Sequence, residues 1–241
     1  MLRLPREPSV TGMMVLAGLT GLVVSQPQPS WALAAALLLA LHILTFDAAF
    51  DSYRAGKKGN TLFLVAANAA PYLAAAYVHA ARDIIEAVGS AAALSALYLL
   101  LAEEIGWKNP YTYIAGSVIP TLPALTLPAF AGSVAEEVWL AWMMLSVYAA
   151  STSAYVESRL AFRSLAPWIA LVIWSPALVI AASACKWLLV AAAEPTIKIV
   201  LNCIRNVKLS APSEIKGMGW RELLRLLVYD VLLVAIITFA C

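Results

Sequence analysis

Charged residues are scarce in this sequence: only 12% of its 241 residues are Asp, Glu, Lys or Arg, and 63% are hydrophobic. A soluble domain carries about 25% charged residues, so this composition argues against a protein dissolved in water. The net charge of +2 is scattered, without a basic run. We therefore expect no nucleic-acid binding. The composition predicts an integral membrane protein.

Cysteine is also scarce, and its spacing excludes two kinds of site. Cys185, Cys203 and Cys241 form no CxxC pair and have no histidine cluster near them in the sequence. The spacing therefore suggests neither a zinc site nor a redox motif. We expect all three cysteines to be packing residues.

Long apolar windows are what the sequence has in abundance. A helix needs roughly 20 apolar residues to cross a membrane, and reading uncharged windows gives nine such segments. They predict an all-α, polytopic integral membrane protein with nine transmembrane helices in one transmembrane helical domain, residues 1–241. The expected spans are Val10–Ser25, Trp31–Phe50, Thr61–Ala81, Ala87–Ala102, Tyr111–Ala131, Val138–Tyr155, Pro167–Ala184, Lys186–Ile204 and Trp220–Ala240.

The positive residues predict the orientation of these spans. Short cytoplasmic loops are rich in Lys and Arg, and counting alternate connections gives twelve positive residues on one side and two on the other. This bias requires Pro167–Ile204 to cross the membrane twice. We expect a multi-pass cell-membrane protein with a cytoplasmic N-terminus and membrane lipid as its surroundings; the sequence names no partner subunit. The larger set is Arg3, Arg6, Arg54, Lys57, Lys58, Lys108, Arg159, Arg163, Arg205, Lys208, Lys216 and Arg221, and the smaller set is Arg82 and Lys186.

The fifth span contains three prolines, Pro120, Pro123 and Pro128. Proline removes a backbone donor and clashes with the preceding turn of a helix. We expect this span to be kinked or locally unwound.

The segment "TFDAAFDSYRAGKKGN", Thr45–Asn60, is the first candidate site. Asp47 and Asp51 are four residues apart, so both carboxylates project from one helical face, where they repel each other. A Mg²⁺ ion would neutralise them, and it typically binds one or two carboxylates together with substrate phosphates. The neighbouring Arg54, Lys57 and Lys58 would then hold a diphosphate. The alternative is a helix end whose charged side chains are simply solvated.

A second corner follows the sixth span, in "AYVESRLAFRS". It contains Glu157, Arg159 and Arg163, and the expected topology places it on the same side of the membrane as the first corner. Two acidic and basic corners on one side suggest two halves of one site.

These two corners resemble the aspartate-rich motifs of the UbiA superfamily of intramembrane prenyltransferases. That resemblance implies a nine-helix UbiA-like bundle that transfers a prenyl group from a prenyl diphosphate to a lipophilic or polar acceptor. It implies that Asp47 and Asp51 bind Mg²⁺ and that Glu157 assists catalysis. It also implies a diphosphate-binding set of Arg54, Lys57, Lys58, Arg159 and Arg163. Ile43 and Ser153 stand where the family pattern has Asn and a second acid.

Both ends of the chain are similar to YwiC-like membrane proteins. "LPRE" resembles the start of their N-terminal element, and "APSEIKGMGWRELLRLLVYDVLLV" resembles their terminal segment. This resemblance implies the alternative function: a non-enzymatic membrane protein that acts as a permease or as an accessory subunit of a membrane complex.

The expected membrane interior contains three ionisable residues, Glu194, Lys198 and Asp230. Ionisable groups within a membrane are costly and mark functional sites by default. Lys198 lies one turn from Glu194 and is expected to pair with Glu194 or Asp230. Two interpretations remain open: a salt bridge that locks two helices together, and an ion or proton pathway.

Overall fold

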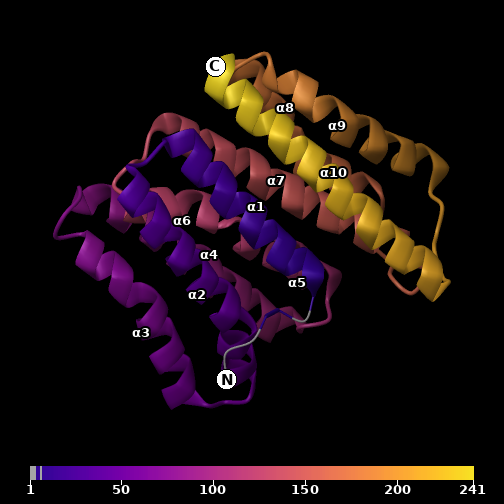
Figure 1. The fold of residues 1–241 in the computed structure, drawn as a ribbon. Helices are drawn as coiled ribbons and strands as arrows, with labels where there is room; N and C mark the ends of the chain where they lie inside the picture. Colours follow the sequence, from indigo (N-terminus) through magenta and orange to yellow (C-terminus); the bar gives the residue numbers. More distant parts are fainter. Residues whose placement is uncertain (1–3, 6) are drawn as a thin grey trace. The chain divides into compact units, whose positions relative to one another are not determined.

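The computed structural model describes residues 4, 5 and 7–241, and all of the named elements in this part of the chain are helical (Figure 1). Arg3 and Arg6, two of the predicted cytoplasmic positive residues, lie outside the described residues. The elements are α1 (Pro8–Ser25), α2 (Pro29–Arg54), α3 (Lys58–Ala75), α4 (Ala81–Ile105), α5 (Pro110–Gly116), the 3₁₀ turn η1 (Ile119–Thr121), α6 (Pro123–Phe130), α7 (Glu136–Arg159), α8 (Trp168–Ala184), α9 (Leu188–Arg205) and α10 (Pro212–Phe239).

Over the described residues, the helices fit the predicted spans in order and number, with α5, η1 and α6 counted as one interrupted span. The all-helical fold class is therefore confirmed. Pro167–Ile204 forms two helices, as the charge bias required. The largest difference is at α10, which begins at Pro212 rather than near Trp220. Proline at the first helical position explains this start, because its missing N–H would have no helical partner there.

The proline-rich fifth span is broken, as the sequence predicts. α5 ends at Gly116, and α6 begins at Pro123 after the short turn η1. Thr121 compensates for part of the break, because its hydroxyl donates to the carbonyl of Val118 at 2.7 Å and lies 2.8 Å from the Ser146 hydroxyl.

Four segments of the described chain are long and apolar enough to cross a membrane, judged by length and composition: α1, α2, α4 and Pro110–Phe130. Large apolar side chains also cover much of the surface. Leu37 on α2 and Leu97 on α4 are 68% and 60% exposed. Exposed apolar surface on this scale is typical of proteins that contact lipid or a partner. The fold is therefore compatible with a membrane protein.

The chain consists of two compact units, which are described separately. The first unit comprises Met1–Ala93 and Leu122–Trp139, and contains α1, α2, α3 and α6. α1 packs closely on α6, because a Cβ atom added at Gly21 would lie 2.3 Å from the carbonyl oxygen of Ala124. Small residues permit such approaches between apolar helices.

A polar cluster joins α2 to α3 inside the first unit. The two ring nitrogens of His42 contact the side-chain oxygen of Asn68 and the Tyr72 hydroxyl, the second at 2.8 Å. Asn68 also donates to the Thr45 hydroxyl at 3.0 Å. His42 is thus a satisfied interior group, since buried polar side chains require such partners.

The second unit comprises Leu94–Thr121 and Leu140–Cys241. Within it, α9 packs against both α8 and α10. Trp174 of α8 is fully buried and donates from its indole to the Thr196 hydroxyl of α9 at 2.8 Å. This unit also contains the cluster of charged side chains from α9 and α10 that is described below.

Candidate functional site

The first predicted corner lies at the end of α2, in the first unit. Asp47 and Asp51 are both in this helix, which ends at Arg54, while Lys57 and Lys58 are exposed beyond it. Asp47, Asp51 and Arg54 are each engaged in a contact. No group of three or more His, Cys, Asp or Glu side chains suited to a metal occurs among the residues with described positions. The Mg²⁺ site therefore stays a prediction.

The second predicted corner lies at the end of α7, in the second unit, so its placement opposite Asp47 and Asp51 also stays a prediction. Glu157 is buried, and the Arg163 Nε atom lies 2.9 Å from its carboxylate. This atom pair is close in space but is not aligned as a hydrogen bond. Burial raises the pKa of Glu157, and the charge of Arg163 partly opposes that effect.

Arg159 and Arg163 of this corner, together with Lys208 of the α9–α10 connection, also hold three connections together. Arg163 donates to the carbonyl of Lys108 at 2.6 Å, and Arg159 donates to the carbonyl of Val207 at 3.3 Å. Lys208 donates to the carbonyl of Ser158 at 2.6 Å. These bonds occupy N–H donors that would otherwise be available to a diphosphate. They give Arg159 and Arg163 a structural role.

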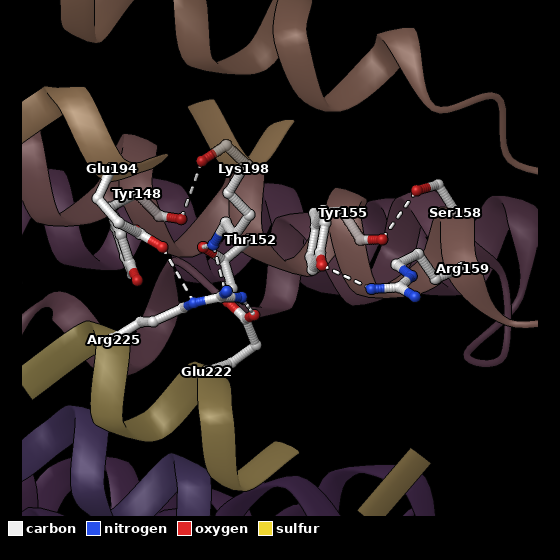
Figure 2. Close-up of polar contacts among 10 residues, drawn as sticks. Tyr148, Thr152, Tyr155, Ser158, Arg159, Glu194, Lys198, Glu222 and Arg225 are labelled. Carbon is white, nitrogen blue, oxygen red and sulfur yellow. Dashed lines mark hydrogen bonds and ion pairs between the residues drawn. The ribbon is translucent and has the colours of Figure 1, made fainter. Parts of the chain in front are cut away.

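Four charged side chains from α9 and α10 meet in the second unit, and we call them the charge network: Glu194, Lys198, Glu222 and Arg225. The Lys198 ammonium is 2.7 Å from the Glu222 carboxylate, and these side chains are only 4% and 8% exposed. Arg225 lies between two acids: its Nη1 donates to Glu222, and its Nε is 3.0 Å from Glu194 (Figure 2). Two cations and two carboxylates thus balance each other.

Side chains of α7 also contact the charge network. Tyr148, Thr152 and Tyr155 are four and three residues apart, so they lie along one face of the helix. Thr152 accepts a bond from the Lys198 ammonium at 3.4 Å. The same ammonium lies 5.3 Å from the ring centre of Tyr148 and 4.9 Å from that of Tyr155. Aromatic faces attract a cation, so they stabilise Lys198 where water is excluded.

Polar contacts continue from the charge network toward the end of α7. Asn202, one turn beyond Lys198 on α9, donates to the Ser158 hydroxyl at 3.0 Å. Arg159 donates to the Tyr155 hydroxyl at 2.8 Å, as Figure 2 shows. In the opposite direction the contacts become aromatic, because Tyr148 stacks on Tyr229 with ring centres 4.2 Å apart. The polar contacts therefore lead toward one end of the helices.

A groove on the outside of α9 and α10 reaches the charge network. It has a volume of about 260 Å³ and is lined mainly by apolar side chains, with Glu194 and Arg225 as its charged members. The Glu194 side chain is 52% exposed and that of Arg225 is 35% exposed. The network thus has one protected carboxylate, Glu222, and one accessible carboxylate, Glu194.

The sequence identified part of this cluster and missed the rest. Lys198 pairs with Glu222, whereas the two expected partners were Glu194 and Asp230. Asp230 is buried on α10, and it has a contact of its own. Glu222 and Arg225 were not singled out, although both lie within the expected span Trp220–Ala240. Their i, i+3 spacing, opposite the i, i+4, i+8 row of Glu194, Lys198 and Asn202, is the signal that was available.

Two cysteine predictions are wrong. Cys185 and Cys241 form a disulfide, whereas Cys203 is free.

No family model, no curated protein and no solved structure matches the chain. The resemblances to UbiA prenyltransferases and YwiC-like proteins therefore rest on the quoted motifs alone.

Proposed function

We propose that this chain is a multi-pass membrane transport protein, a permease, in which the charge network takes up and releases a proton. One observation supports this most strongly: a buried pair, Lys198 and Glu222, is connected through Arg225 to the accessible carboxylate of Glu194. A purely structural pair needs no second, exposed acid. Networks of this kind within membranes mark ion or proton pathways.

The membrane setting is supported by the long apolar helices and by the exposed apolar side chains. We further propose the nine-span arrangement with a cytoplasmic N-terminus, on the strength of the charge bias. In this arrangement the polar contacts around Ser158, Arg159 and Lys208 lie at the cytoplasmic end of the second unit. Protons would approach the network from that end or through the groove.

The four charges suggest how one proton would change the structure. Protonation of Glu194 removes the carboxylate that binds the Arg225 Nε. Arg225 and Lys198 would then share Glu222 as their only network acid, leaving one uncompensated positive charge. An uncompensated charge beside the nearly inaccessible pair of Lys198 and Glu222 is unfavourable, so we expect α9 and α10 to rearrange. Such a two-state element is what alternating access requires.

We favour transport over prenyl transfer because the residues of the charge network meet within one unit at ion-pair distances. The residues expected for prenyl transfer are divided between the two units. Prenyl transfer remains a separate hypothesis, based on the resemblance of Asp47 and Asp51 to the family motif.

A pH jump on the reconstituted protein tests the proposal. Full-length protein is placed in liposomes on a solid-supported membrane, and the external pH is lowered quickly. We expect a transient current as protons bind, which Glu194→Gln removes. Glu214→Gln is the matched control, because Glu214 is an exposed acid on α10 outside the network. Absence of a current in the unmodified protein contradicts the proposal.

A further inference from the structure

The disulfide joins two distant parts of the second unit. Cys185 lies in the turn between α8 and α9, and Cys241 follows α10, 56 residues later. Their Cα atoms are 5.7 Å apart, which is within the usual range for a disulfide. Figure 1 shows the end of α10 beside the α8–α9 turn. The bond therefore fixes one end of α9 to one end of α10.

The opposite ends of the same two helices carry positive charge. α9 ends at Arg205, Lys208 is in the connection, and Lys216 and Arg221 are in the first part of α10. Short loops rich in Lys and Arg remain in the cytoplasm, whereas disulfides persist mainly in oxidising compartments outside it. The positions of the positive residues and of the disulfide are independent indicators of orientation in a membrane. Here both indicators give the same orientation for α9 and α10.

We propose that Cys185 and Cys241 form an oxidative modification site on the non-cytoplasmic face of the membrane. The reaction is thiol–disulfide exchange with the disulfide of an oxidoreductase in that compartment. The thiolate of one cysteine attacks the oxidoreductase disulfide, giving a mixed disulfide and one released oxidoreductase thiolate. The second cysteine then displaces the other oxidoreductase sulfur. The chain gains one S–S bond and loses two protons and two electrons, and the oxidoreductase disulfide is converted to a dithiol.

The third cysteine is an internal control for this proposal. Cys203 is free and lies on α9 just before Arg205, at the positively charged end. It is 15 residues beyond Leu188, so about 22 Å of helix separates it from the α8–α9 turn. The proposal therefore places Cys203 near the cytoplasmic face. This inference does not depend on proton uptake by the charge network.

Counting thiols in the full chain tests the modification. Membranes are quenched with acid to trap thiols, and the denatured protein is tagged with a maleimide polymer that retards it on a gel. We expect one tag before reduction, on Cys203, and three tags after reduction. A Cys203→Ser variant should take none before reduction and two after. Three tags without reduction would overturn the proposal.

Labelling from one side of the membrane tests the location. Intact cells expressing Cys203→Ser receive a membrane-impermeant reductant and then an impermeant maleimide. We expect labelling without permeabilisation. The matched variant, Cys185→Ser with Cys241→Ser, retains only Cys203 and should be labelled only after permeabilisation. The reverse pattern would show that the disulfide faces the cytoplasm, and would overturn the assigned side.

Discussion

The charged residues of the charge network differ in how far their side chains are exposed to solvent. Lys198 and Glu222 are nearly inaccessible, whereas Glu194 is half-exposed on the groove. The sequence indicated that Lys198 and Asp230 are interior residues, because charges in long apolar windows are rare, and both are buried, whereas Glu194 is not. It could not predict their partners, since these depend on how α9 and α10 are rotated against each other. Glu222 and Arg225 were missed for that reason.

Removal of the protected carboxylate should be severe. Glu222→Gln leaves the buried Lys198 ammonium without its carboxylate partner, and breaking a buried pair in this way costs about 3–5 kcal/mol of stability. Thermal unfolding of the detergent-purified protein measures the loss. Replacing Lys198 and Glu222 together by Met should cost less than the single change. Glu214→Gln, at an exposed site on the same helix, should have little effect; an equal loss there would contradict this explanation.

The aspartates of α2 carry the separate hypothesis of prenyl transfer. If Asp51 binds Mg²⁺ with Asp47, then Asp51→Asn should abolish Mg²⁺-dependent transfer of a labelled prenyl chain while leaving the protein folded. The assay uses purified protein with a radiolabelled prenyl diphosphate and extracted membrane lipids as acceptors. Transfer that continues unchanged in the variant would remove the proposed roles of both aspartates.

Helices were the most predictable feature of this protein. Apolar windows located every long helix, with ends within six residues of those observed except at the start of α10, where polar residues precede the apolar stretch. The break between α5 and α6 followed from Pro120 and Pro123, because proline acts on the backbone locally. The contacts between helices were not predictable in the same way. The close approach of α1 to α6, for example, depends on which face Gly21 presents.

That approach gives a prediction for the first unit. Gly21→Ala would place a methyl group against the Ala124 carbonyl, and overpacking of this kind costs about 1–3 kcal/mol. A lower thermal unfolding temperature is therefore expected. Gly89→Ala on α4 is the matched control, because nothing lies within 4 Å of the added Cβ. Alanine favours helix over glycine, so the control should be neutral or stabilising. Equal behaviour of the two variants would contradict close α1–α6 packing.

The proposed orientation of the chain in a membrane rests on two kinds of residue. The bias of Lys and Arg was visible in the sequence, and it required α8 and α9 to be separate helices. The pairing of Cys185 with Cys241 was not visible, because 56 residues separate them and no spacing motif connects them. Whether the two acidic corners face each other is likewise a question of tertiary placement, which local sequence does not determine.

Proton binding at Glu194 is the central claim, and the pH-jump current of Glu194→Gln is its most direct test. The unmodified protein should give a transient current, the Glu214→Gln control should keep it, and Glu194→Gln should lose most of the displaced charge. If Glu194→Gln instead gives the same current as the unmodified protein, the charge network is a structural lock between α9 and α10 and does not take up the proton.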